Sequence, residues 1–245
     1  MTSAPPPGRY DWLDFNAPMS SELADSLVAR VAKTAPETVI DVGCGWGELL
    51  LRVVAASSAA HGRGIDVDAS LLVRARGNAA ARGLDTRVGF DSQLPDPEVD
   101  SAEVVICIGA DHIFGTQEAA LRALLPLVRS GGRLLFGTGF WEASPSEEDA
   151  AAVGLLPTDL SSLADLVDLA ITVGFRVLDL RTATRREWEE FEFGYLADWE
   201  EWLMKYGRDE LAPETRERAD RHRTEYLRHW RDFLGFAYLT LGKPI

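Results

Sequence analysis

Short apolar segments alternate along the chain with stretches whose apolar residues recur at helical spacing. Seven segments are rich in β-branched or other apolar residues and have the length of strands: 38–42, 64–67, 86–90, 104–109, 133–137, 175–180 and 237–241. Strands with little internal polar alternation that are separated by helices are typical of a parallel sheet covered on both faces. The pattern therefore predicts an α/β domain.

Four helices are predicted before the fifth strand, at 20–33, 48–57, 69–82 and 116–128. The first follows the capping residue Ser20 and is stopped by Pro36, and the third has Asp68 as its N-cap. Residues 1–9 contain three consecutive prolines and predict a frayed tail. We divide the chain into a tail and pocket-covering segment (1–19), a core (20–184), an insertion (185–235) and the last strand of the core (236–245).

The insertion is helical in pattern and rich in aromatic residues. Six of them recur at intervals of three or four and share one helix face: Trp188, Phe191, Tyr195, Trp199, Trp202 and Tyr206. Gly194 interrupts this aromatic stripe and predicts a kink or break there. In one interpretation the stripe is ordinary core, packed on helices of the sheet or on the second subunit of a homodimer.

In the other interpretation the insertion is a lid. The sixth strand runs parallel to its neighbours, so it ends at their carboxyl edge and the inserted helices begin over any pocket there. Tyr195 and Trp199 are then candidate substrate contacts. Glu192 and Asp198 flank the stripe, and carboxylates beside aromatic faces form a cage that attracts a cation, such as an amine-bearing substrate.

Length and composition restrict the class of protein. The 245 residues suit one large domain with an insertion, and the hydrophobic fraction of 46% suits a globular core. The net charge of -14 is the wrong sign for binding nucleic acid. Without a long apolar run or a signal-peptide pattern, we expect a cytoplasmic protein that does not bind membranes. The cysteines, Cys44 and Cys107, lie in apolar stretches and are expected to be reduced.

A glycine-rich turn between the first strand and the next helix carries the strongest functional signal. The segment 38–48 reads TVIDVGCGWGE, and glycines at such a turn let a ligand approach the backbone and the helix N-terminus. A dinucleotide site has the pattern GxGxxG, but here Glu48 occupies the third glycine's place and would lie near a pyrophosphate. A cofactor without phosphate meets no such repulsion.

Three motifs resemble those of the class I S-adenosylmethionine (SAM)-dependent methyltransferases. The first is Asp41 followed by GxGxG at 43–47, the second is Asp66 at the end of the second strand, and the third is the Leu-x-x-x-Gly-Gly turn at 127–132. They cover roughly residues 38–140. The stretch 109–115 and the aromatic C-terminal helices look most like a little-characterised bacterial branch of the family with small-molecule substrates.

The resemblance implies a doubly wound, seven-stranded mixed sheet of the Rossmann-like methyltransferase fold, with its last strand antiparallel and the helical insertion between strands six and seven. It also implies a SAM site. Asp41 and the loop Gly43, Cys44 and Gly45 would hold the methionine end, and Asp66 with Val67 would hold the ribose. The remaining cofactor contacts implied are these: Asp91, Ser92 and Gly109. An ionised carboxylate accepts from both hydroxyls of a diol, which suits Asp66.

The carboxyl ends of strands four and five offer catalytic and substrate candidates, because ligands bind at that edge of such a sheet. His112 is the candidate base, since imidazole accepts protons near pH 7, and Asp111 is a second candidate. Each has a structural alternative, as pocket wall and helix cap. Trp141 and Glu142 are candidate substrate contacts, or else core rim and solvated acid. The other histidines show no ligand spacing, so no metal is predicted.

These observations predict a SAM-dependent methyltransferase that acts on a small-molecule nucleophile. The sulfonium already carries an activated methyl group, so the protein needs mainly to exclude water and align the acceptor. Two alternatives stay open: a non-catalytic subunit with a SAM-type fold that binds a partner through the stripe, and a nicotinamide-dependent oxidoreductase, which Glu48 disfavours.

Overall fold

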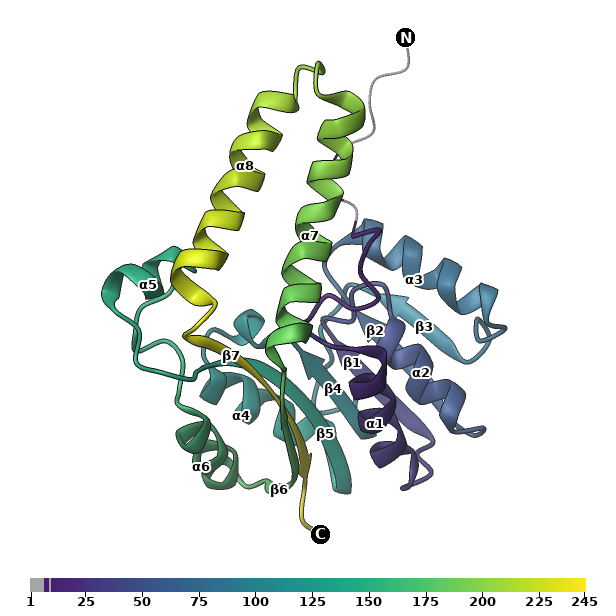
Figure 1. Ribbon diagram of the computed structural model, residues 1–245. Helices are drawn as coiled ribbons and strands as arrows, with labels where there is room; N and C mark the ends of the chain where they lie inside the picture. Colours follow the sequence, from purple (N-terminus) through teal and green to yellow (C-terminus); the bar gives the residue numbers. More distant parts are fainter. Residues whose placement is uncertain (1–6, 9) are drawn as a thin grey trace.

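A seven-stranded sheet lies at the centre of the protein, with helices against both faces (Figure 1). The computed structural model describes residues 7–8 and 10–245, so most of the predicted tail lies outside the described residues. The strand order is β3-β2-β1-β4-β5-β7-β6, and β7 is antiparallel to both of its neighbours while the other pairs are parallel. The predicted fold class is confirmed.

The strands follow the predicted order, and two helices between the fifth and sixth strands were not predicted. The strands are β1 (Thr38–Val42), β2 (His61–Ile65), β3 (Val88–Asp91), β4 (Ala102–Ile108), β5 (Val128–Trp141), β6 (Arg176–Thr182) and β7 (Leu234–Gly242). The helices are α1 (Ser21–Ala32), α2 (Glu48–Ala56), α3 (Ala69–Ala81), α4 (Gln117–Leu127), α5 (Glu147–Ala152), α6 (Leu163–Val173), α7 (Arg185–Tyr206) and α8 (Ala212–Glu225). Two short turns complete the fold: the 3₁₀ turn η1 (Asp111–Phe114) and the π-helical turn η2 (Tyr226–Trp230).

The second strand begins and ends earlier than its sequence pattern predicts. It pairs with β1 from His61 to Ile65, whereas the prediction was 64–67. Gly62 and Gly64 interrupt the apolar pattern by which the other strands were predicted. Glycine is required at both positions because Leu50 packs closely against Gly62 and Phe90 against Gly64. Asp66 therefore lies just past the strand, in the turn that faces the carboxyl edge.

Two hydrophobic clusters fill the space between the sheet and its helices. Helices α1, α2 and α3 cover one face, and α4 and α6 cover the other. The predicted N-caps are confirmed at Ser20, which accepts from the amide of Leu23, and at Asp68, which accepts from the amides of Ser70 and Leu71. No described helix is long and apolar enough to cross a bilayer.

The insertion is a helical hairpin of α7 and α8 that rises from the carboxyl edge of the sheet (Figure 1). A break at Gly194, one of the two predicted possibilities, is wrong, because α7 is continuous through it. Glycine is needed at this position for another reason: a Cβ there would lie 2.5 Å from Cδ2 of Leu13. Tertiary contact with the segment before α1 therefore explains this residue, which helix propensity alone does not.

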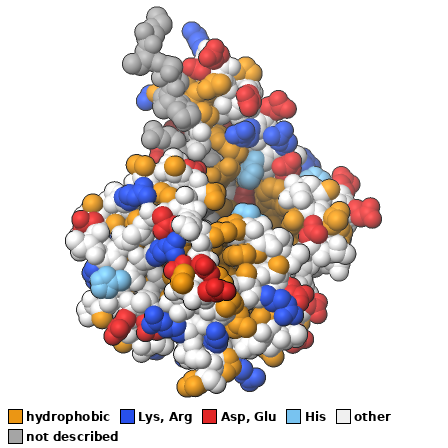
Figure 2. Space-filling view, turned by 180° about the vertical axis from the view of Figure 1, so that it is seen from behind, with side chains coloured by type: hydrophobic (Ala, Val, Ile, Leu, Met, Phe, Trp, Pro, Cys, Tyr) orange, Lys and Arg blue, Asp and Glu red, His pale blue; other side chains and the backbone are white. Residues whose placement is uncertain are grey.

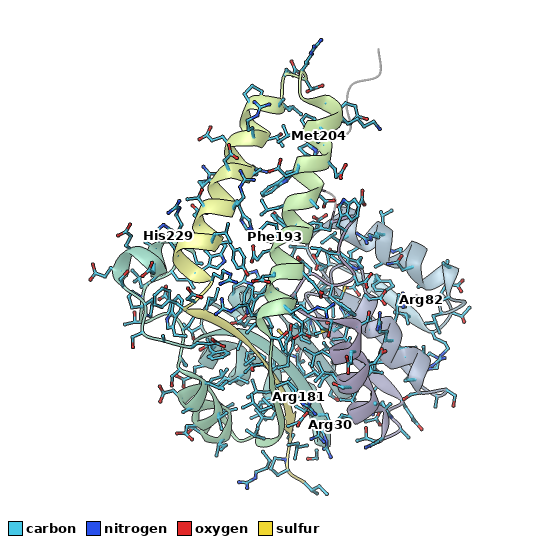
Figure 3. The ribbon with its side chains drawn as sticks, viewed as in Figure 1. Arg30, Arg82, Arg181, Phe193, Met204 and His229 are labelled. Atoms are coloured by element: carbon cyan, nitrogen blue, oxygen red, sulfur yellow. The ribbon has the colours of Figure 1, made fainter. Side chains whose placement is uncertain are left out.

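The aromatic stripe changes partners along α7. Near the base of the hairpin Trp188 packs edge-on against Phe236 of β7. Further along, Leu196 and Trp199 are buried with Ala219 of α8. Trp202, further along the stripe, is buried as well, whereas Met204, near the tip and outside the stripe, is 86% exposed (Figure 3). The stripe is thus core at its base and the contact between α7 and α8 above it.

Glu187 ties the insertion to the first helix of the core. Its carboxylate accepts from the backbone N–H and hydroxyl of Ser20 at 3.1 and 2.6 Å, and from those of Thr184 at 2.8 and 2.9 Å. Burial by itself would raise the pKa of Glu187, but these hydrogen bonds outweigh it and lower the pKa. The Glu187 carboxylate therefore accepts hydrogen bonds from the N-cap residues of both α1 and α7.

We expect Glu187→Gln to lower the free energy of unfolding by about 2 kcal/mol at pH 7, because hydrogen bonds to a charged group are lost. A lowered pKa contributes stability that is present above the unfolded value of 4.5 and is lost as the pH falls through the lower folded value. The difference between the two proteins should thus shrink below about pH 4. Urea unfolding across pH measures it, and a pH-independent gap would contradict the assignment.

Candidate cofactor pocket and active site

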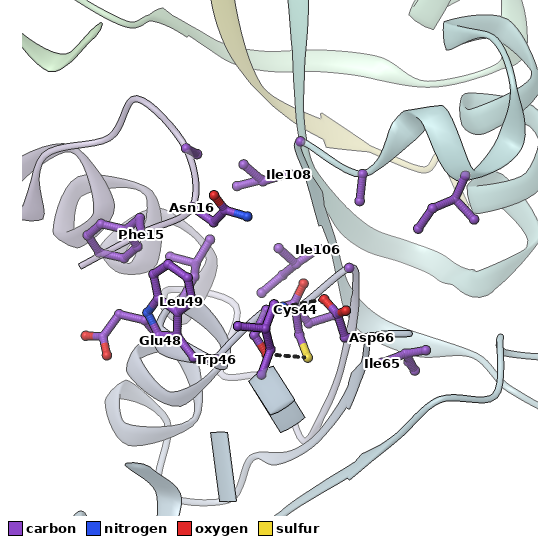
Figure 4. Close-up of a pocket in the computed structure, with 18 of the residues that line it drawn as sticks. Phe15, Asn16, Cys44, Trp46, Glu48, Leu49, Ile65, Asp66, Ile106 and Ile108 are labelled. Carbon is purple, nitrogen blue, oxygen red and sulfur yellow. Dashed lines mark hydrogen bonds between the residues drawn. The ribbon is translucent and has the colours of Figure 1, made fainter. Parts of the chain in front are cut away.

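A pocket of about 290 Å³ lies at the carboxyl ends of β1, β2 and β4. The loop before α2, the turn after β2, the start of η1 and the segment before α1 surround it (Figure 4). Most of the predicted cofactor residues line it: Asp41, Gly43, Cys44, Gly45, Asp66, Val67, Ser92 and Gly109. His112 lines it as well.

The glycine loop is held in shape by the neighbouring strand. The amides of Gly43 and Cys44 both donate to the carbonyl of Ile65, at 2.8 and 2.9 Å. Gly43 and Gly45 have positive φ angles of 76° and 54°. A Cβ on Gly43 would overlap Ala110, whereas a Cβ on Gly45 would meet no atom within 4 Å. Gly45 is itself buried, but the space at its Cβ position is open, so a ligand in the pocket can approach the backbone there.

Asp66 links the loop to the turn after β2. Its carboxylate accepts from the amide of Gly45 at 2.8 Å and from the amide of Asp68 at 2.9 Å. Each oxygen has a second lone pair, so the side chain can still accept hydrogen bonds from a ligand in the pocket. Asp66 can therefore hold the turn at the end of the strand and bind a ligand at the same time.

Asp41 is a buried acid in the pocket floor, with only 4% of its surface exposed. Burial, with the nearby charge of Asp66, raises its pKa to about 8. A cationic group that enters the pocket would stabilise the ionised form. Burial also raises the pKa of the Cys44 thiol, which keeps this free cysteine neutral, and Cys107 is a buried free cysteine.

Glu48 carries less weight against a dinucleotide than its sequence position suggested. It lines the pocket, but its carboxylate is ion-paired with Arg52 and Arg82. These two guanidinium groups compensate the charge that would repel a pyrophosphate.

The predicted adenine contact Asp91 does not line the pocket. Its two oxygens accept from Nε and Nη2 of Arg63 at 2.8 and 3.1 Å, and these bonds lower the pKa of Asp91. Ser92 and Leu94 reach the pocket in its place. The short connection after β3 turns the two neighbouring side chains, Asp91 and Ser92, in different directions.

Asp111 and His112 also diverge. Asp111 accepts from the hydroxyl of Thr138 at 2.7 Å, and that hydroxyl accepts from Nε2 of Gln117 at 3.0 Å. Burial raises the pKa of Asp111, and the bond from Thr138 opposes the rise. This chain braces η1 against β5, which accounts for Asp111 structurally. His112 is exposed and faces the pocket.

The predicted substrate contacts after β5 lie outside this pocket. Trp141 is buried, and its indole N–H donates to the carbonyl of Pro157 at 3.0 Å. Glu142 is exposed, and its amide donates to the carbonyl of Phe233 at 2.9 Å. Their positions match the structural alternative, in which Trp141 closes the rim of the core.

The predicted cation cage on α7 is already occupied. The ring of His222 from α8 lies 5.3 Å from that of Tyr195 and 5.7 Å from that of Trp199, between centroids. Its Nε2 is 2.6 Å from Oε2 of Glu192. The other flanking acid, Asp198, accepts from the backbone amide of Asp11. Both acids are engaged by the chain itself, so the stripe forms no open cage for an amine.

The covering segment, residues 10–20, supplies side chains that sequence reasoning did not single out. Phe15, Asn16, Ala17 and Met19 line the pocket (Figure 4). The segment is held by the indole N–H of Trp46, which donates to the carbonyl of Asp14 at 2.8 Å, and by the hydroxyl of Tyr238, which donates to the carbonyl of Pro18 at 2.8 Å. In the sequence, the only indication that these side chains line a pocket was the presence of apolar residues between the proline-rich stretch and the first helix.

Known proteins resemble this chain in sequence and in fold. A family model described as "Methyltransferase domain" matches residues 40–134. YjhP of Escherichia coli K12 is 28% identical over 221 residues, which cover 88% of this chain and 89% of YjhP. The 27-O-demethylrifamycin SV methyltransferase of Amycolatopsis mediterranei is 28% identical over 148 residues, 58% of this chain and 54% of that enzyme.

A crystal structure of a SAM-dependent methyltransferase from Geobacter sulfurreducens, in complex with S-adenosyl-L-homocysteine, superimposes with a TM-score of 0.84. It is 25% identical, and the match covers 98% of this chain and 99% of that one. Together with the sheet order and the glycine loop, these likenesses support a class I SAM-dependent methyltransferase, an enzyme whose cofactor is SAM.

Gly45→Ala should weaken the binding of S-adenosyl-homocysteine at least tenfold, because the new methyl group enters the space where the ligand approaches. Gly83→Ala is the matched control: its φ is 65°, and a Cβ there also meets no atom within 4 Å. Both variants pay a similar backbone strain of about 1–2 kcal/mol. Calorimetry should show near wild-type affinity for Gly83→Ala, and equal losses in the two variants would contradict this site.

Asp41→Asn should stabilise the protein while weakening SAM binding. The folded pKa of about 8 lies above the unfolded value of 3.8, so the folded state holds the extra proton and wild-type stability falls as the pH rises between these values. Asparagine does not titrate, so the variant's advantage should grow up to about pH 8. SAM is cationic, so its affinity for the wild type should rise over the same window. Thermal unfolding and calorimetry at several pH values test both trends.

Proposed function

We propose that the protein transfers the methyl group of SAM to a small-molecule nucleophile. The observation that carries this proposal is one pocket in which the open face of Gly45, the carboxylates of Asp41 and Asp66 and the side chain of His112 converge. The name of the rifamycin-related relative, which describes a small-molecule methyltransferase, supports the substrate class.

We assign the cofactor contacts by place in the pocket. Asp41 and the backbone of Gly43–Gly45 would hold the methionine end, where a buried acid meets cationic groups. Asp66 and Val67 would hold the ribose. Ser92 and Leu94, in place of Asp91, would border the adenine, while Asp91 fixes the turn through Arg63.

SAM supplies an electrophilic methyl group on a sulfonium, so the residues around it need to position the acceptor and receive its proton. The wall between β4 and the covering segment is formed largely by Phe15, Ile106 and Ile108, which exclude water. His112 and Asn16 add polar groups there. We assign His112 as the group that takes the proton from the methyl acceptor or contacts that acceptor directly. Asp111 holds the turn on which His112 lies, through Thr138.

The insertion acts on the pocket through the covering segment. Glu187, Gly194 and Asp198 of α7 hold Ser20, Leu13 and Asp11. We therefore propose residues 10–20 as the pocket's direct cover and α7 as its support. A lid role of the hairpin tip stays a prediction.

His112→Ala should bind S-adenosyl-homocysteine as the wild type does but transfer methyl groups about 100-fold more slowly, the low end of a general base's contribution. Turnover can be followed with an acceptor found by screening metabolites for SAM consumption. His61→Ala, at the exposed start of β2, is the control and should leave turnover unchanged. Unchanged turnover in His112→Ala would reduce this residue to pocket wall.

A further inference from the structure

A second cavity, of about 330 Å³, lies between α7 and α8. Phe191, Tyr195 and Trp199 form its aromatic wall, and α8 contributes Arg218, Arg221 and His222. In the space-filling view the surface is hollowed where the hairpin meets the body, and hydrophobic and histidine side chains border the hollow (Figure 2). The cavity shares no lining residue with the cofactor pocket.

The polar centre of this cavity is a histidine oriented by a carboxylate. Glu192 has a side chain only 5% exposed, and its Oε2 lies 2.6 Å from Nε2 of His222. A carboxylate accepts hydrogen bonds, so Nε2 carries the hydrogen of this bond. In a neutral imidazole with that tautomer, Nδ1 is an acceptor. Among the described residues nothing bonds to Nδ1, and the ring borders the cavity.

Two neighbouring buried donors also lack partners within the described chain. They are the indole N–H of Trp230 and the hydroxyl of Tyr226. The ring of Trp230 lies 5.5 Å from that of His222, and Tyr226 packs against Trp230. Buried polar groups normally have partners, and an unpaired one costs about 1–3 kcal/mol. Neither side chain lines the cavity, so within this group it is the ring of His222 that a ligand in the cavity can contact.

The rings around His222 select for a flat, electron-rich group. Tyr195 and Trp199 meet edge to face at 4.7 Å, and the guanidinium of Arg218 lies 5.8 Å from the ring of Trp199. A flat ring that enters beside them gains contact with aromatic faces, and a nearby cation favours a ring rich in electrons. The acceptor at Nδ1 requires a hydrogen-bond donor on that ring.

We propose that this cavity binds a phenolic ring, with the phenol O–H donating to Nδ1 of His222 and the ring lying against the half-buried side chains of Phe191 and Tyr195. The further statement that the phenol belongs to the methyl acceptor rests on the proposed function. The binding itself does not, and no covalent step is assigned to the cavity.

The test is titration calorimetry of the full chain with 4-methylphenol, 4-methylanisole and benzylamine. We expect 4-methylphenol to bind at least tenfold more tightly than 4-methylanisole, which has the same ring without a donor. Benzylamine should bind no better than 4-methylanisole, because His222 already fills the aromatic cage. Equal binding of the phenol and its methyl ether, or tighter binding of the amine, would overturn the proposal, and neither result depends on a variant.

Variants then locate the site. His222→Ala should weaken 4-methylphenol about tenfold. His229→Ala is the matched control, because its Nδ1 pairs with Asp149 at 3.2 Å and it lies outside this cavity, beside α5 (Figure 3). Unchanged affinity in a folded His222→Ala refutes the site. S-adenosyl-homocysteine titrated into the same samples reports on the cofactor pocket. If 4-methylphenol binds and S-adenosyl-homocysteine does not, only the methyl transfer is refuted. If S-adenosyl-homocysteine binds and 4-methylphenol does not, only this cavity is refuted as a phenol site.

Discussion

The carbonyl of Ile65 accepts two amides of the glycine loop, and the shape of the cofactor pocket depends on this shared acceptor. Gly43 and Cys44 donate to it at 2.8 and 2.9 Å. Because β1 and β2 are parallel neighbours, the end of one strand lies beside the first turn after the other. The same turn places Asp66 against the amide of Gly45. A single strand pair thereby fixes both the conformation of the loop and the position of the Asp66 carboxylate.

A buried acid in this pocket shows how binding and stability oppose each other. Asp41 lies in the floor with a pKa raised to about 8 by burial and by Asp66. Two acids near each other in an apolar site disfavour ionisation, and a cationic ligand reverses that preference. A cationic ligand in this pocket would relieve the unfavourable arrangement, and acids with perturbed pKa values are typical of functional sites.

The helical hairpin is joined to the pocket by the covering segment. Glu187 holds both N-caps, and Gly194 leaves room for Leu13. Consequently α7, whose sequence lies more than 160 positions away, determines how residues 10–20 close over the cofactor loop. The cavity between α7 and α8 belongs to the same hairpin, whereas no residue of the insertion lines the cofactor pocket.

The sequence by itself determined the order of the strands, the four helices before the fifth strand, the glycine loop, the acid after β2 and the cap at Asp68. These features depend on local chemistry: backbone freedom at glycine, alternation of apolar runs and capping of a helix end. Only the tertiary structure decided which of two adjacent side chains faces the pocket. Asp91 is hydrogen-bonded to Arg63, and Asp111 is hydrogen-bonded to Thr138. Their neighbours Ser92 and His112 therefore line the cofactor pocket.

The same reason explains the aromatic stripe and the covering segment. Helical spacing placed Tyr195, Trp199 and Glu192 together, but the ring that fills the space between them, His222, comes from another helix. Asn16 reaches the cofactor pocket because Trp46 and Tyr238 hold the chain around it. Partners from distant segments decide where a polar side chain points, and one-dimensional spacing contains no information about them.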